Sequence, residues 1–305
     1  MIPEAARSAL VSLLGERVRF DAPLARYTSL RVGGPADALV EPGTRGELLG
    51  VLRLCAAHRL PHTLLGAGFN TLCLDGRLAG VVVQLGRLRR LEERPGRGLR
   101  AEAGVSHSQV ANFCAKRGFA GLEFAAGIPG TLGGWVAMNA GVPGREIADV
   151  VREIEVASPA GAGIRHLPRE ALHFRYRALR GLAPGSVIVS ALLTVELSTP
   201  DAVRAEVERL LERRARTQPL HVPSCGSVFK NPPGDFAGRL IESVGLKGRR
   251  IGGAEISKVH ANFIANVDRA TAGDVVALMA EAQCAVARAT GRRLEPEVRI
   301  VGSAT

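Results

Sequence analysis

The chain has 305 residues, of which 46% are hydrophobic and 23% are charged. That length allows two or three domains with cores of their own, and the composition excludes a disordered chain. The formal net charge of +11 favours anionic ligands. Nucleic acid is not an expected partner, because the sequence has no uninterrupted basic run and few aromatic residues that could stack on bases.

The cysteines are scattered, with no CxxC pair and no histidine at the spacing of metal ligands. Such a set is typical of reduced thiols, so we expect a cytoplasmic protein without a metal site. The N-terminal segment lacks the apolar region and cleavage site of a secretory signal. No apolar run is long enough to span a membrane, so no membrane partner is expected.

Alternating strands and helices are predicted for the first part of the chain. Thr44 with Glu47, and Ser106 with Gln109, form capping boxes that predict the first turn of two helices. The second of these helices should end at Gly118. Period-two alternation and apolar runs predict strands at 36–41, 63–65, 81–85, 101–104, 151–157 and 187–197. The pattern indicates an α+β region built on sheets.

A domain boundary is predicted near residue 200, where Ser-Thr-Pro precedes an amphipathic helix over 202–214. Two further helices are expected at 237–244 and 271–290, the second closed by Gly291. The last predicted element is a strand at 297–301. Alternation along it would put Glu295, Glu297 and Arg299 on one face.

The first candidate ligand site is the glycine loop Gly66-Ala67-Gly68-Phe69-Asn70-Thr71, which directly follows a predicted strand. Consecutive backbone N–H groups in such a loop can hold phosphate oxygens, because no Cβ blocks the approach. A Rossmann fingerprint would need a third glycine and a following helix, and both are missing. A nucleotide at this loop would therefore be bound by another kind of fold.

The second candidate is a glycine-rich segment, GLEFAAGIPGTLGGWVAMNAG. Glycine costs about 0.5–1 kcal/mol relative to alanine in regular structure, so this density indicates either a ligand site or tight packing of backbone on backbone. Two such loops favour a long ligand held at both ends. The candidate contacts are Gly127, Ile128, Pro129, Gly130, Thr131, Gly133, Gly134, Asn139, Ala140 and Gly141.

Taken together, these segments resemble the UDP-N-acetylenolpyruvoylglucosamine reductase family, in its shorter, type II form. Each segment alone is a weak signal, but their number and order are specific. The matching segments are YTSLRVGGPAD, LGAGFNT, GLEFAAGIPGTLGG, MNAG, FRYR, PSCGSVFKNPPGDFAGRLIESVGLKG, GGAEISKVHANFI and LEPEVRIVG.

The resemblance implies an α+β fold. A two-subdomain FAD-binding part of the vanillyl-alcohol-oxidase (PCMH) type would occupy residues 1–78 and 79–200. An α+β substrate-binding domain would follow at 201–305. FAD would be bound without covalent attachment, with its pyrophosphate on the two glycine loops.

The implied activity is NADPH-dependent reduction of the enolpyruvyl group of UDP-N-acetyl-3-O-(1-carboxyvinyl)-glucosamine. The product, UDP-N-acetylmuramate, is a peptidoglycan precursor. The implied partners are this UDP-sugar and NADPH, and the implied oligomeric state is a monomer. Two alternatives stay open: an inactive flavin- or nucleotide-binding protein on the same scaffold, and an oxidase with covalently held flavin.

Matched to the family's motifs, the catalytic positions fall on Arg177, Ser227 and Glu297. A guanidinium can grip a carboxylate on which charge develops, a hydroxyl can give a proton to a carbanion-like carbon, and a carboxyl in a dry pocket can act as an acid. From the residues alone, the arginine could instead form a salt bridge and the serine an ordinary turn. The expected substrate contacts are Tyr176, Lys230, Asn231, Arg239, Lys247 and His260.

Some positions depart from the family's pattern or remain ambiguous. Phe69 stands where the family usually has serine, so a hydroxyl contact to the pyrophosphate is not expected from the first loop. Leu179 also stands where serine is more usual, at the end of the YRAL segment on which the assignment of Arg177 depends. Cys225 precedes the candidate serine and is interpreted as a packing residue, because the reaction needs no covalent step. His260 could equally be a substrate contact or a core histidine.

Overall fold

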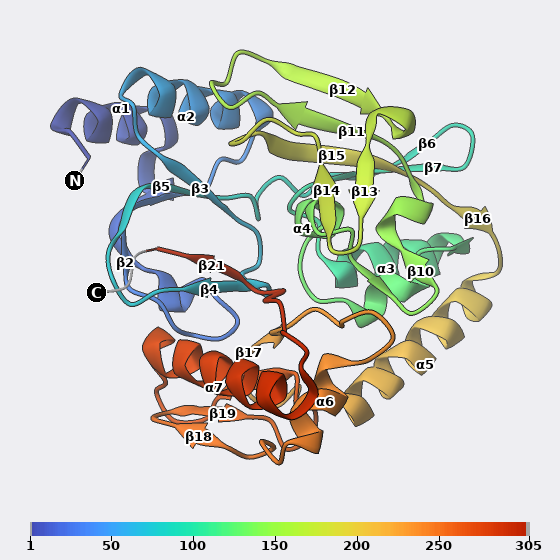
Figure 1. Cartoon of the computed structure of the whole chain (residues 1–305). Helices are drawn as coiled ribbons and strands as arrows, with labels where there is room; N and C mark the ends of the chain where they lie inside the picture. The colour runs from blue at the N-terminus through green and yellow to red at the C-terminus, as the bar shows by residue number, and fades with distance from the viewer. Residues whose placement is uncertain (1, 303–305) are drawn as a thin grey trace. The chain divides into compact units, whose positions relative to one another are not determined.

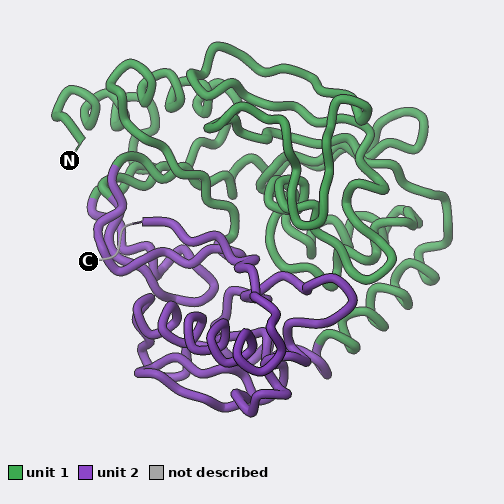
Figure 2. Tube along the Cα trace, viewed as in Figure 1, with its two compact units in different colours: residues 1–20, 37–67, 80–214 green, residues 21–36, 68–79, 215–305 purple. Residues whose placement is uncertain are grey.

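A computed structural model describes residues 2–302, which form two compact units (Figure 2). Unit 1 comprises the residues up to Phe20, Asp37–Ala67 and Gly80–Arg214; unit 2 comprises Asp21–Ala36, Gly68–Ala79 and the residues from Ala215 on. Both units are thus built from separate stretches of chain. Residues 201–214, at the start of the predicted last region, lie in unit 1.

The helices and strands are labelled in Figure 1. The α-helices are α1 (Glu4–Leu14), α2 (Arg45–Ala57), α3 (His107–Arg117), α4 (Leu132–Ala137), α5 (Pro200–Thr217), α6 (Ala237–Ser243) and α7 (Ala272–Thr290). The strands are β1 (Val18–Pro23), β2 (Pro35–Val40), β3 (His62–Leu65), β4 (Thr71–Cys73), β5 (Leu78–Gln84), β6 (Leu91–Arg94), β7 (Gly98–Glu102), β8 (Phe119–Ala120), β9 (Gly141–Val142), β10 (Arg145–Glu146), β11 (Val151–Ala157), β12 (Ile164–Pro168), β13 (His173–Arg175), β14 (Ala178–Arg180), β15 (Val187–Thr194), β16 (Glu196–Leu197), β17 (Ser224–Ser227), β18 (Arg250–Ile251), β19 (Ala254–Ile256), β20 (Phe263–Asn266) and β21 (Arg299–Val301).

The first sheet of the chain has the strand order β1-β2-β5-β3, with β3 and β5 parallel. Helices α1 and α2 supply apolar side chains to the same core cluster as β2 and β5, including Leu10, Leu48 and Val83. Helix α2 begins with the predicted capping box, in which Thr44 and Glu47 bond reciprocally. The first glycine loop leaves this sheet at the end of β3.

The second sheet of unit 1 is antiparallel, in the order β12-β11-β15-β7-β6. One core cluster packs this sheet with α3 and α4, including Leu99, Val110, Trp135 and Ile154. Helix α3 has the predicted capping box and ends at Gly118, whose left-handed conformation closes it. The second glycine loop therefore sits on a well-packed scaffold.

Unit 2 contains an antiparallel sheet, β17-β20-β19-β18, and the parallel pair β21-β4. Helix α7 packs against β18 and β19 (Figure 1), and its residues Val275, Leu278 and Met279 enter the core of this unit. As predicted, α7 ends at Gly291 in a left-handed conformation. Cys225 of β17 belongs to the same core, which confirms its interpretation as a packing residue.

The end of the chain corrects one prediction: β21 begins at Arg299, and not at 297. Residues 295–297 instead make a single β-bridge, Phe229 with Pro296. The N–H groups of Glu297 and Val298 both donate to the carbonyl of Val228, which explains why pairing with β4 starts only at Arg299. The alternation expected to link Glu295, Glu297 and Arg299 therefore does not extend over these residues; Glu295 is exposed and Glu297 is half-buried.

Other boundaries differ in smaller ways. The stretch 187–197 is divided into β15 and β16, α5 runs to Thr217, and α1 was not predicted.

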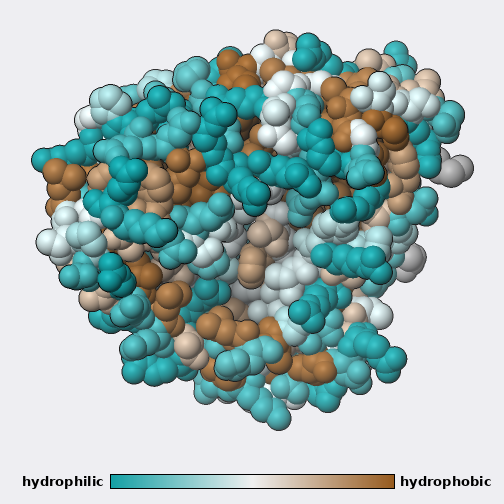
Figure 3. Space-filling view, turned by 180° about the vertical axis from the view of Figure 1, so that it is seen from behind, coloured by the Kyte–Doolittle hydropathy of each residue, from teal (hydrophilic) through white to brown (hydrophobic). Residues whose placement is uncertain are grey.

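Hydrophilic residues cover much of the face in Figure 3, where the hydrophobic ones form small groups. Between residues 2 and 302, no helix combines the length and apolar character needed to cross a bilayer.

Candidate active site

Ser227 lies on the wall of a cavity of about 400 Å³ in unit 2. This volume is within the range of about 300–1,000 Å³ that is typical of small-molecule sites. The lining residues are Ser227, Asn231, Phe236, Gly238, Arg239, Glu242, His260, Ala261 and Asn262. The structure therefore brings three of the predicted substrate contacts, Asn231, Arg239 and His260, together with the predicted proton donor.

A β-bulge precedes Ser227. Ser224 pairs with Ala265 and Ser227 with Phe263, so β17 carries an extra residue relative to β20. Gly226 accommodates it with a φ of +82°, a left-handed conformation that favours glycine. Bulges of this kind re-aim the following side chain and are over-represented next to active sites. The glycine before the serine thus sets the direction of the serine side chain.

Glu297 lies beside the chain segment that follows Ser227. Its backbone N–H donates to the carbonyl of Val228 over 2.8 Å, next to the Phe229–Pro296 bridge. Its own carbonyl accepts a hydrogen bond from the Asn70 carboxamide at 3.2 Å. Asn70, from the first glycine loop, therefore helps to fix the backbone of the predicted catalytic glutamate.

Asn231 and Arg239 are both held by residues at the start of α6. The Asn231 carboxamide oxygen accepts the N–H of Ala237 at 3.0 Å, which satisfies one of the N–H groups that have no partner within the first turn of α6. The Arg239 guanidinium makes two hydrogen bonds to Asp235, one of 2.6 Å from Nε to Oδ1. An anionic ligand in the cavity would compete with Asp235 for this guanidinium.

His260 forms part of the cavity wall in a defined tautomer. Its Nδ1 accepts the N–H of Asn262 at 3.2 Å, so in the neutral ring Nε2 carries the hydrogen. Burial lowers the pKa of His260, and the charge of Lys247 lowers it further. A Cβ at Gly238 would lie 2.9 Å from His260 Cε1, so a glycine is needed there. His260 is therefore a neutral donor.

The remaining predicted contacts do not line the cavity. Lys230 pairs with Glu295 at 3.4 Å, and Lys247 pairs with the lining residue Glu242 at 2.8 Å. Tyr176 belongs to unit 1 and is exposed.

Arg177 lies in the turn of the β13–β14 hairpin with a φ of +55°. Its Nη1 donates to the carbonyl of Gly141 at 3.4 Å, and its guanidinium lies 5.0 Å from the centre of the Tyr176 ring. The Asn139 carboxamide donates to the Arg175 carbonyl at 3.1 Å. The hairpin is thereby tied to the end of the second glycine loop.

The two glycine loops meet within unit 1. A Cβ on Gly66 would lie 2.8 Å from the Thr131 hydroxyl oxygen, so only glycine allows this approach. At Gly134, by contrast, a Cβ would meet nothing within 4 Å, and at Gly127 only Val142 at 4.0 Å. Open space against bare backbone is what a pyrophosphate requires, so these loops fit FAD.

Sequence reasoning missed several lining residues: Phe236, Gly238, Glu242, Ala261 and Asn262. Gly238 and Glu242 are four residues apart on α6, which places them on one helix face, so their spacing is a usable signal. Phe236 is 63% exposed. Nothing in the sequence alone distinguishes this residue from a core phenylalanine.

Comparison with known proteins places this site in a family. Residues 36–166 match the family model described as FAD binding domain, and residues 218–301 match UDP-N-acetylenolpyruvoylglucosamine reductase, C-terminal domain. A UDP-N-acetylenolpyruvoylglucosamine reductase of Anaeromyxobacter sp. (strain Fw109-5) is 49% identical over 94% of this chain and 89% of its own length. The chain belongs to the UDP-N-acetylenolpyruvoylglucosamine reductase family.

Further relatives support this family and its fold. The reductase of Geobacter metallireducens is 44% identical over 95% of both chains. The crystal structure of the Thermus caldophilus reductase is 34% identical, with a TM-score of 0.79 over 93% of this chain and 98% of that one. The predicted α+β fold with an FAD-binding part is confirmed, as is the class of FAD-dependent oxidoreductase.

Proposed function

We propose that this chain uses NADPH and non-covalently bound FAD to reduce UDP-N-acetyl-3-O-(1-carboxyvinyl)-glucosamine to UDP-N-acetylmuramate, a step of peptidoglycan precursor synthesis. The observation that carries the proposal is Ser227 on the wall of a cavity, in the segment that matches the reductase C-terminal domain. The open backbone at Gly127 and Gly134 supports FAD binding at the glycine loops.

The reaction adds a hydride to the methylene carbon of the enolpyruvyl group and a proton to the carbon that bears the carboxylate. FAD, when bound, supplies the hydride, which originates from NADPH. Ser227 donates the proton from its hydroxyl. A hydroxyl is a weak acid, but a carbanion-like carbon is basic enough to take its proton if the two are held within hydrogen-bond reach.

Arg177 and Glu297 support this transfer. The Arg177 guanidinium stabilises the negative charge that spreads into the substrate carboxylate, because it stays charged and can offer two parallel donors. Glu297 acts as an acid or hydrogen-bond donor near Ser227. Its backbone bond to Val228 supports this assignment, since it keeps Glu297 close to the serine segment.

The UDP-sugar is bound by Tyr176, Lys230, Asn231, Arg239, Lys247 and His260. His260 suits a ligand oxygen, since its Nδ1 already accepts a backbone N–H and only Nε2–H remains to donate. Arg239 and Lys247 are positive groups whose present partners are carboxylates, which a pyrophosphate could replace.

We also propose that the enzyme is a monomer and that it is cytoplasmic. The cytoplasmic location follows from the substrates, because NADPH and nucleotide sugars are cytoplasmic metabolites. The proposal also retains three functional regions: residues 1–78 and 79–200 for FAD and 201–305 for the substrate. Sedimentation of the purified holoenzyme tests the monomer. A dimer stable at working enzyme concentration would require that part to be revised.

An anaerobic absorbance experiment tests the function. The purified protein should show the flavin spectrum, lose it on addition of NADPH, and regain it when the enolpyruvyl UDP-sugar is added. Release of all flavin on denaturation would separate this enzyme from an oxidase with covalently held flavin. A reduced sample that the sugar fails to reoxidise would refute the substrate assignment and favour a binding protein.

A further inference from the structure

The chain that follows Ser227 is clamped by the side chain of Asn262. The Phe229 N–H donates to the Asn262 carboxamide oxygen at 2.9 Å, and the carboxamide nitrogen donates to the Phe229 carbonyl at 2.8 Å. Asn262 is only 3% exposed. Its side chain thus satisfies both backbone groups of Phe229, as a neighbouring β-strand would.

The backbone of Asn262 extends the clamp in both directions. Its carbonyl accepts the Val228 N–H at 2.8 Å, and its N–H donates to His260 Nδ1 at 3.2 Å. Asn262 therefore connects the residues after Ser227 to His260, which also lines the cavity. Because these groups are buried and bonded, losing one partner leaves another polar group without compensation.

The bonds of Asn262 lie next to the irregular part of the β17–β20 pairing. The bulge at Gly226 interrupts pairing just before Ser227, and β17 ends at the Ser227–Phe263 pair. The bonds of Asn262 to Val228 and Phe229 restrain the chain directly after Ser227. A proton donor needs this restraint, because a misplacement of about 1 Å can cost about 100-fold in rate.

We propose that Asn262 is a positioning residue for proton transfer by Ser227: its carboxamide fixes Phe229 and so holds the serine hydroxyl at the cavity. The proposal rests on the function proposed above. Asn262 itself does not contact the reacting atoms in this proposal. Substitution of Asn262 should therefore slow reoxidation of the flavin by the substrate, and not flavin reduction by NADPH.

The decisive variants are Asn262→Ala, which removes both side-chain bonds to Phe229 and keeps the backbone bonds, and Asn262→Asp, which is nearly isosteric but replaces the donor to Phe229 with a carboxylate oxygen. The matched control is Asn266→Ala, at the end of β20, the strand that begins directly after Asn262. The Asn266 side chain donates to the Leu30 carbonyl at 3.1 Å and accepts the Ala270 N–H at 2.9 Å, so it too is structural. It makes none of the bonds that hold Val228 and Phe229.

In the holoenzyme, Asn262→Ala should leave flavin reduction by NADPH unchanged and slow reoxidation by the enolpyruvyl sugar by about 10- to 100-fold, with a larger solvent isotope effect. Asn262→Asp should be slow at neutral pH and recover as the pH falls, because protonation restores a donor to Phe229. Deuterium uptake in residues 224–231 should rise in both variants. Asn266→Ala should show none of these changes.

Equal reoxidation rates in Asn262→Ala and Asn266→Ala would overturn the proposal, as would a parallel fall of both half-reactions. If Asn262→Ala does not fold, the pH profile of Asn262→Asp decides: a profile parallel to the unaltered protein refutes the clamp. Failure of the unaltered protein to reoxidise is a different outcome, since it rejects the proposed function itself.

Discussion

Glu297 and Val228 are joined by a backbone hydrogen bond of 2.8 Å, from the N–H of Glu297 to the carbonyl of Val228. Val228 directly follows Ser227, so the two proposed proton-handling residues lie on neighbouring segments of unit 2. Neither segment is a long element: one follows a bulge and the other a single bridge. The placement of these side chains therefore depends on a few specific contacts.

The backbone conformation of Gly226 also helps to place the Ser227 side chain. Its φ is +82° and a Cβ there would meet nothing within 4 Å, so Gly226→Ala introduces backbone strain without a clash. We expect a loss of about 1–2 kcal/mol in the free energy of unfolding together with slower substrate-dependent reoxidation. Gly291→Ala is the matched control, because Gly291 has a φ of +70° and equally open surroundings. Similar reoxidation rates in the two variants would contradict this role of Gly226.

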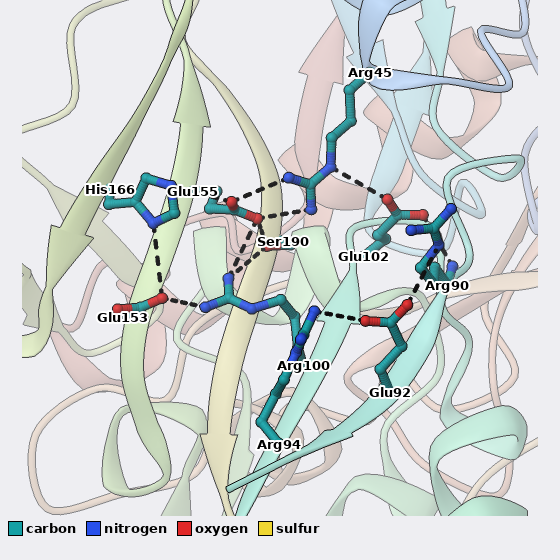
Figure 4. A network of polar contacts seen from close by, with 10 residues as sticks. All are labelled: Arg45, Arg90, Glu92, Arg94, Arg100, Glu102, Glu153, Glu155, His166 and Ser190. Atoms are coloured by element: carbon teal, nitrogen blue, oxygen red, sulfur yellow. Dashed lines mark hydrogen bonds and ion pairs between the residues drawn. The ribbon is translucent and has the colours of Figure 1, made fainter.

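Glu155 is central to a polar network on the second sheet of unit 1 (Figure 4). Arg45 donates to both of its oxygens, at 3.0 and 2.7 Å, and Arg100 lies 3.2 Å away. Burial opposes ionisation of Glu155, but these partners outweigh it and lower the pKa. Glu155→Gln should lower the free energy of unfolding by about 1–3 kcal/mol, as measured by denaturant titration.

The control for Glu155 is Glu93→Gln. Glu93 pairs with Arg117 at 3.0 Å, with side chains that are 49% and 56% exposed. An exposed pair should contribute less than about 1 kcal/mol. Equal losses in the two variants would show that burial of the network adds nothing.

Glu47 should make stability depend on acid pH. The side-chain hydrogen bond from Arg17 is the main cause that lowers its pKa from 4.5 to about 2. Because the pKa is depressed in the folded state, the stabilisation is fully present above 4.5 and is lost as the pH falls toward about 2. Unfolding at a series of pH values should show this loss in the unaltered protein. An unchanged slope in Arg17→Gln would exclude the pair as its source.

The local signals of the sequence were sufficient for the long elements. The capping boxes at Thr44 and Ser106 and the closing glycines 118 and 291 depend only on nearby residues, and the structure has all of them. The serine strand β17 could not be predicted, because it is short and contains Gly226. Its structure depends on pairing with β20, which is distant in the sequence.

At the candidate site, too, local motifs could be read from the sequence, whereas contacts between distant segments could not. The motif GSVFKNP singled out Ser227, but Asn262 was invisible as a clamp, because its role exists only once β17 and β20 are paired. The expected face of Glu295 and Glu297 depended on a strand that begins only at Arg299. Periodicity could not reveal that a single bridge at Pro296 holds this segment.

The thiols provide a simple test of the packing. Cys284 is exposed, whereas Cys55, Cys73, Cys114 and Cys225 are buried. Burial raises the pKa of Cys225 to about 12, so its thiolate is scarcely populated at neutral pH. A thiol reagent should label Cys284 alone in the native protein and the buried cysteines only after denaturation. Rapid native labelling of Cys225 would contradict its place in the core of unit 2.

In the proposed mechanism Ser227 gives the proton to the substrate carbon, and single-turnover reoxidation of the Ser227→Ala holoenzyme tests this step. We predict that NADPH reduces the flavin at the unaltered rate, whereas reoxidation by the enolpyruvyl UDP-sugar slows by about 10²- to 10⁴-fold. A loss of less than about tenfold, with substrate binding intact, would contradict the account.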